Sequence, residues 1–96
     1  MAAKEYGAKV KVVDMSPEVS EDAIRTCAEA LKEHGVERDC AEAVKKQFDE
    51  RHGAAWHCIV GKAFGSFVTH ETGNFIFFTI GDTTFLLWKN GTASEN

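Results

Sequence analysis

The sequence predicts a small α+β domain in which two antiparallel helices pack on an antiparallel β-sheet. At 96 residues the chain is the size of one domain, with flexible ends expected at 1–7 and 92–96. Between residues 17 and 52, apolar side chains recur every three or four positions, which is typical of amphipathic helices. From residue 56 onward the period is two, and aromatic and β-branched residues dominate, which indicates strands.

The composition excludes several classes of function. The formal net charge of −4 is opposite to what binding of a nucleic-acid backbone requires. The longest apolar stretches are about six residues, far below the roughly 20 of a membrane-spanning helix, so no membrane segment is expected. The three cysteines are widely spaced and odd in number, which fits neither a disulfide framework nor a paired zinc motif and favours a reducing, cytosolic compartment.

The first predicted elements are a strand at residues 9–13 and a helix that begins after it. Ser16 can act as the N-cap and Pro17 suits the first helical position. Gly35 is placed to end the helix in a left-handed cap. The apolar face of this helix is expected to consist of Val19, Ala23, Ile24, Cys27, Ala28 and Leu31.

A second helix is predicted to follow at once and to end at Gly53. Because the joint at Gly35 is short, the two helices are expected to be antiparallel. The apolar face of the second helix is expected to consist of Val36, Cys40, Ala43, Val44 and Phe48.

Four strands are predicted after the helices, at residues 56–60, 64–69, 74–80 and 83–89, and proximity along the chain favours a meander. Gly81 and Asp82 form a two-residue hairpin signal. The strand at 74–80 is largely apolar on both faces. Two helices can cover only one face of a small sheet, so the other face favours a dimer.

Candidate catalytic or metal-binding side chains are few. His57, Cys58, His70, Cys27 and Cys40 are possible members of a metal or thiol site. However, His57 and Cys58 are adjacent in a strand and point to opposite faces. Cys58 is more simply interpreted as a small buried apolar residue, and the pair His70-Glu71 as part of a turn. The glycines at 61 and 65 do not have the spacing of a phosphate-binding loop.

Two segments carry a resemblance to a known family. WHCIVGK at 56–62 and FGSFVTHET at 64–72 closely resemble the dynein light chain family, the small dimeric hub class rather than the roadblock or Tctex classes. Segments at 14–16, 30–31, 36–39, 44–49, 75–76 and 86–87 fall at the family's spacing, so residues 8–89 align without a gap. The resemblance implies a homodimer in which the strand at 64–69 leaves its own sheet and completes the sheet of the partner protomer.

The resemblance also implies a non-enzymatic function without a cofactor or a metal. The expected partners are the dynein intermediate chain and other disordered proteins that carry Thr-Gln-Thr-like motifs and add a strand to the swapped edge. The expected location is the cytoplasm, in association with the cytoskeleton. The groove for the partner segment is expected to consist of Glu37, Arg38, Phe64, Gly65, Ser66, Phe67, Val68, Thr69, His70, Phe75, Phe77, Thr84 and Leu86. The dimer interface is expected to consist of Trp56, His57, Ile59, Phe64, Ser66 and Val68.

His57 is expected to lie at the two-fold axis, so acidification below about pH 6 is expected to favour the monomer. The alternative is a histidine whose ring is satisfied by a neighbouring hydroxyl.

This chain departs from typical members of the family at several positions. It has Ala63 where asparagine is typical and Asn74 where histidine is typical, and tyrosine is typical at the positions of Phe67, Phe77 and Thr79. These changes predict a wider, less polar groove and a shifted ligand preference. Asn90 replaces a serine that is often linked with phospho-regulation of the dimer, so that switch is expected to be missing.

Two other functions remain open. One is a dimerisation clamp for cytosolic partners that is independent of dynein. The other is a small thiol or metal-dependent enzyme.

Overall fold

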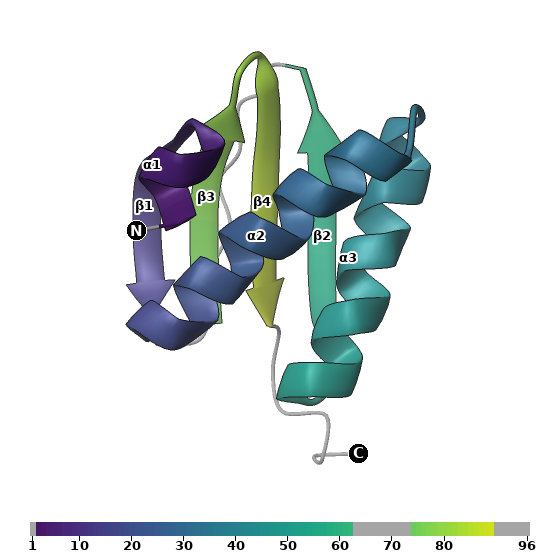
Figure 1. Ribbon diagram of the computed structural model, residues 1–96. Coiled ribbons are helices and arrows are strands. Elements are labelled where there is room, and N and C mark those ends of the chain that lie inside the picture. Colours follow the sequence, from purple (N-terminus) through teal and green to yellow (C-terminus); the bar gives the residue numbers. More distant parts are fainter. Residues whose placement is uncertain (1, 63–73, 90–96) are drawn as a thin grey trace.

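The computed structural model describes residues 2–62 and 74–89 and has two layers, with the helices on one face of the sheet (Figure 1). None of the helices in these residues is long and apolar enough to cross a membrane. The α+β class predicted from the sequence is confirmed. In chain order the elements are α1 Ala2–Tyr6, β1 Ala8–Met15, α2 Pro17–Glu33, α3 Glu37–His52, β2 Trp56–Gly61, β3 Asn74–Ile80 and β4 Thr83–Lys89.

The four described strands form one antiparallel sheet in the order β1-β3-β4-β2. β3 and β4 are the predicted hairpin, with Ile80 opposite Thr83 and the turn at Gly81 and Asp82. β2 pairs with β4 rather than with a sequence neighbour, so the simple meander is wrong. The predicted strand at residues 64–69 lies outside the described residues.

Local sequence signals explain where the two long helices begin and end. The Ser16 hydroxyl accepts a hydrogen bond from the Val19 amide at 3.3 Å, and Pro17 is the first residue of α2. The left-handed cap predicted at Gly35 is wrong: α2 ends at Glu33, and its C-cap His34 is extended. Gly53 does end α3, at a φ of 79°. A helix also forms at Ala2–Tyr6, which the sequence analysis did not predict.

The core lies between the helices and the near face of the sheet. Most of the predicted α2 face is buried, and α3 contributes Cys40, Val44 and Phe48. Val36 is an exception, because it precedes α3 and is 53 % exposed. The aromatic ring of Phe48 meets that of Trp56 edge-on at 4.9 Å between centroids. The sheet contributes Trp56, Ile76, Phe78, Phe85 and Leu87.

A polar cluster joins α2 to the end of α3. The carboxylate of Asp22 accepts hydrogen bonds from Arg25 and Arg51 at 2.8 Å and from Thr26 at 3.2 Å. The Nε2 atom of His52 lies 2.7 Å from the same carboxylate. Helical periodicity could not reveal this cluster, because its partners come from positions about 30 residues apart.

Candidate functional site

The sheet face opposite the helices is rich in apolar side chains. Residues that pair across antiparallel strands point to the same side of the sheet. The core residues and their cross-strand partners therefore mark the face that the helices cover, which is the near face. The residues that alternate with them along each strand mark the opposite face, which is the far face. Phe75 pairs with Trp88, and Phe77 pairs with Leu86. The far face therefore carries a continuous row of large apolar side chains, as the two-faced pattern of the strand at 74–80 predicted.

The far face continues onto β2, which is the last strand of the described sheet. Ile59 pairs with Leu86, and its side chain is 43 % exposed. His57 pairs with Trp88, and the two rings stack with centroids 5.4 Å apart and an interplanar angle of 28°. An exposed isoleucine beside a strand edge that no described strand pairs is the kind of surface that proteins usually cover.

Asp49 holds the start of β2 against α3. Its carboxylate accepts a hydrogen bond from the Trp56 amide at 2.8 Å and another from the Lys45 ammonium at 2.6 Å. Burial by itself raises the pKa of Asp49, but the hydrogen bonds from Lys45 and Trp56 outweigh it and hold the pKa below 3.8. A charged side chain of the helix layer thus binds the first residue of β2, next to His57.

The start of α3 has no side-chain cap. Its N-cap residue is Val36, which cannot accept a hydrogen bond with its side chain. The first backbone N–H groups of a helix have no intrahelical acceptor, and the helix dipole places partial positive charge there. Glu37 and Arg38 lie in this first turn, and both are exposed.

The predicted groove residues fall into three groups. Phe75, Phe77, Thr84 and Leu86 all lie on the far face, where Thr84 pairs with Thr79 and donates a hydrogen bond to the Lys62 carbonyl at 3.4 Å. Glu37 and Arg38 lie at the start of α3. The remaining positions, Phe64, Gly65, Ser66, Phe67, Val68, Thr69 and His70, lie outside the described residues.

The predicted dimer-interface residues on β2 have different environments within the single chain. Ile59 is exposed and His57 is half-buried, whereas Trp56 is only 1 % exposed and packs on Phe48. The role of Trp88 as a stacking partner was missed in the sequence analysis. The hairpin register could have revealed it, because Trp88 lies two residues from Leu86 and therefore on the same face.

Two of the three cysteines are poor candidates for a reactive thiol. Cys27 and Cys40 are buried in the core, and Cys58 is half-buried on β2. Burial, reinforced by the neighbouring Cys58, raises the pKa of Cys27 well above 9.0, and burial raises the pKa of Cys40 to about 11. Such thiols stay protonated at neutral pH and are poor nucleophiles. Among residues 2–62 and 74–89, no three His, Cys, Asp or Glu side chains are arranged to hold a metal ion.

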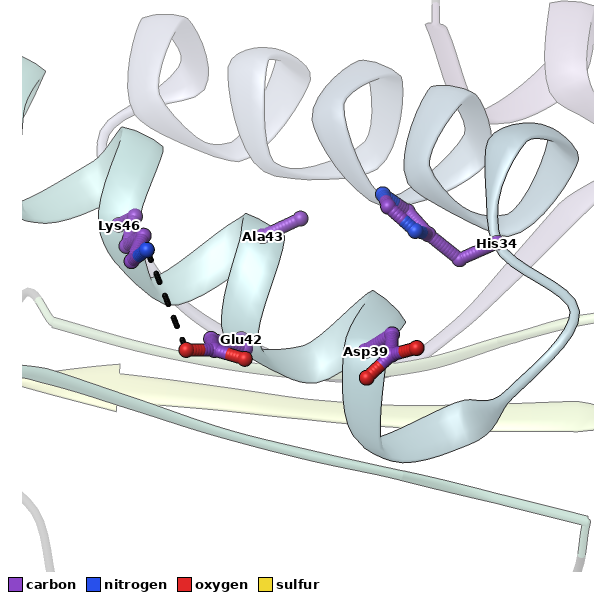
Figure 2. Close-up of a pocket in the computed structure, with 5 residues that line it drawn as sticks. All are labelled: His34, Asp39, Glu42, Ala43 and Lys46. Atoms are coloured by element: carbon purple, nitrogen blue, oxygen red, sulfur yellow. Dashed lines mark ion pairs between the residues drawn. The ribbon is translucent and has the colours of Figure 1, made fainter.

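A polar hollow of about 270 Å³ lies between the end of α2 and the first turns of α3 (Figure 2). His34 points from the end of α2 toward Ala43 of α3, and Asp39, Glu42 and Lys46 complete the lining. Glu42 and Lys46 form an ion pair at 3.9 Å. The charges are mixed and exposed, so the hollow has no chemistry comparable to that of the far face.

The architecture defines a small α+β protein with a helix layer on one face of its sheet and an apolar face on the other. The family model for dynein light chain type 1 matches residues 7–90. The chain is 52 % identical over 87 residues to a dynein light chain of Schistosoma mansoni, which covers 91 % of this chain and 98 % of the relative. It is 47 % identical over 81 residues to a cytoplasmic dynein light chain of Emericella nidulans, covering 84 % of this chain and 86 % of the relative. The chain therefore belongs to the dynein light chain family, as its two motifs indicated.

Solved structures show the same fold at low sequence identity. The dynein light chain-like domain of the Fasciola hepatica calcium binding protein FhCaBP2 superposes with a TM-score of 0.77 at 21 % identity, covering 88 % of this chain and 92 % of that one. The corresponding domain of CsTAL3 gives a TM-score of 0.71 at 17 % identity, covering 85 % and 90 %. These similarities support the fold, whereas the family assignment rests on the closer sequence relatives.

Proposed function

We propose that this protein is a cytoplasmic, non-enzymatic hub and dynein motor light chain that forms a homodimer and binds short linear motifs of disordered partners by strand addition. The observation that carries the proposal is the combination of an apolar far face with the terminal strand β2, where Ile59 is 43 % exposed. A second protomer that pairs with β2 would bury this side chain and satisfy the backbone groups of the strand edge. The relative named as cytoplasmic supports the proposed location.

The far face and the start of α3 supply complementary means of recognition. The apolar floor proposed for alternate side chains of an extended partner consists of Phe77, which is half-buried, and of Phe75 and Leu86, which are only 7 % and 1 % exposed in the single chain. The uncapped N-terminus of α3 offers N–H donors to a side-chain carbonyl such as that of glutamine. Since Phe77 and Thr79 lack phenolic hydroxyls, we expect weaker selection for polar groups above the sheet than in typical members of the family.

The free energy of binding one partner segment is small, so a dimer with two binding sites holds linked partners better than a single site does. About five ladder hydrogen bonds contribute roughly 0.5–1.5 kcal/mol each, and ordering a disordered segment offsets much of this, so one site binds at about micromolar strength. Two sites on one dimer raise the effective concentration for the second of two linked partner chains to about the millimolar range. The dimer would therefore align two partner chains without catalysing a reaction.

Dimerisation through β2 is tested by the variant Ile59→Glu, with Val12→Glu as the matched control. Both residues are exposed on terminal strands, at 43 % for Ile59 and 47 % for Val12, so neither variant is expected to unfold the chain. We expect sedimentation velocity to show a dimer for the native chain and for Val12→Glu, and a monomer for Ile59→Glu. A monomeric native chain, or an unchanged dimer in Ile59→Glu, contradicts the proposal.

Motif binding is tested by calorimetric titration with a peptide that carries a Thr-Gln-Thr core. We expect saturable binding of two peptides per dimer with a Kd of about micromolar. Replacing the glutamine with alanine is expected to weaken binding by about tenfold, because the carbonyl that meets the α3 N-terminus is lost. Absence of saturable binding to a dimer that is otherwise intact contradicts the recognition mode.

A further inference from the structure

The outer edge of β1 is a second exposed strand edge, at the end of the sheet opposite β2 (Figure 1). β3 pairs with one side of β1, and no strand in residues 2–62 and 74–89 pairs with the other. Five consecutive residues of this strand, positions 9–13, are exposed. They include Val10 at 39 %, Val12 at 47 % and Val13 at 49 %.

The exposed valines lie on both faces of β1. Val10 and Val13 pair with the core residues Phe78 and Ile76, so they point toward the helix side, whereas Val12 pairs with Phe77 and points to the far side. A single exposed valine is ordinary, but three of them on a strand edge that no described strand pairs form the surface that an added strand covers.

The charges on this edge restrict what can pair with it. Lys9 and Lys11 are exposed among the valines, in a chain whose net charge is −4. Lys11 lies at a register shift between Val10 and Val12. Lysines on an edge strand oppose pairing with another copy, since each copy brings the same positive charges to the shared edge. The same lysines attract a strand that carries carboxylates.

We propose that the outer edge of β1 binds an extended, acidic segment of a partner protein by strand addition. In such a segment, β-branched residues on one face contact Val10 and Val13, glutamate or aspartate side chains on the other face lie opposite Lys9, and Lys11 at the register shift adds positive charge. This site lies at the opposite end of the sheet from the β2 edge and does not require a dimer; only Val12, which pairs with Phe77, borders the groove of the proposed function.

The test uses the full-length, isotope-labelled chain and the capped peptide Thr-Glu-Val-Glu-Val-Glu-Thr, with a matched peptide that has lysine in place of glutamate. We expect the acidic peptide to shift the amide resonances of residues 9–13 and to slow their hydrogen exchange. We expect no such effect from the lysine peptide. Raising the salt concentration should weaken the binding of the acidic peptide, because the facing charges are exposed.

Charge variants locate the site. The double variant Lys9→Glu with Lys11→Glu is expected to weaken binding of the acidic peptide by about tenfold. The control is Lys32→Glu with Lys46→Glu, which changes the net charge equally on exposed helical positions and should leave binding within about twofold. Circular dichroism verifies that both double variants remain folded.

Several outcomes would overturn the proposal. Equal binding of the acidic and lysine peptides would show that charge does not select the partner. Protection of β1 that depends on protein concentration without peptide would assign the edge to a second copy. The Ile59→Glu variant should still bind the acidic peptide, and the Thr-Gln-Thr peptide should not displace it. If the native chain fails to dimerise but still binds the acidic peptide, only the proposed function is overturned, and the β1 site stands.

Discussion

Asp22 is the single residue on which most polar contacts between α2 and α3 depend. It is only 7 % exposed and contacts two arginines, a threonine and a histidine. Because Asp22→Asn removes the negative charge that these cations share, we expect the free energy of unfolding to fall by about 2–3 kcal/mol. Urea denaturation measures the change. The control Glu29→Gln removes an exposed charge on the same helix and should change the stability by less than about 0.5 kcal/mol.

The same carboxylate predicts how stability depends on pH. Burial raises the pKa of Asp22, but the His52 hydrogen bond and the Arg51 charge outweigh it, so the net pKa lies below 3.8. A lowered carboxyl pKa contributes stability that is complete above the unfolded value, about pH 4, and is lost as the pH falls through the folded value. Asp22→Asn should therefore flatten the fall in stability below pH 4, and an unchanged slope would contradict this assignment.

The raised pKa values of the Cys27 and Cys40 thiols predict slow chemical modification of these two residues. With a pKa of about 11, Cys40 should react with a disulfide reagent at pH 8 about a hundredfold more slowly than it does in urea. Cys27, which is fully buried, should be at least as slow, and the half-buried Cys58 should react first. Mass spectrometry of the modified peptides identifies each site. Fast modification of Cys27 or Cys40 in the folded chain would reopen the possibility of a thiol enzyme.

Among the elements, the β3–β4 hairpin depends on one backbone conformation. Gly81 has a φ of 61°, and a Cβ atom there would meet nothing within 4 Å. Gly81→Ala should therefore cost only the backbone strain, about 1–2 kcal/mol in thermal or urea denaturation. Gly35 is a matched control, because it also has open space but no positive φ, so Gly35→Ala should be neutral or slightly stabilising. Equal effects of the two variants would contradict this explanation.

On the scale of the whole molecule, acidification should separate the proposed dimer. His57 lies in β2, the last strand of the described sheet, and stacks on Trp88. Two protonated imidazoles at a two-fold interface would repel each other and lose hydration, so we expect acidification to weaken the dimer in sedimentation velocity. Circular dichroism distinguishes dissociation from the acid unfolding that starts near pH 4. His57→Phe should remain a dimer at pH 5, and a native dimer that persists at pH 4.5 would contradict the prediction.

Local patterns determined most of the elements and the family. The N-cap at Ser16, the stop at Gly53 and the turn at Gly81 are each encoded within a few residues, so they could be predicted from the sequence. The two motifs beginning at Trp56 and Phe64 predicted the family that the relatives confirm. The far-face positions of Phe75, Phe77, Thr84 and Leu86 followed from the two-residue period of a strand.

Tertiary structure alone decided the features that depend on residues distant in the chain. The burial of Asp22 requires Arg51 and His52 from the far end of α3, and no periodicity encodes that meeting. The pairing of β2 with β4 overrides proximity, because hydrogen bonding and burial of the whole sheet outweigh the entropy of closing a longer loop. The exposure of Val10 and Val13 depends on where the helices cross the sheet, because both point to the helix side. The sequence thus determined local conformation and family, whereas only the packed chain decided which of these side chains are buried and which stay exposed.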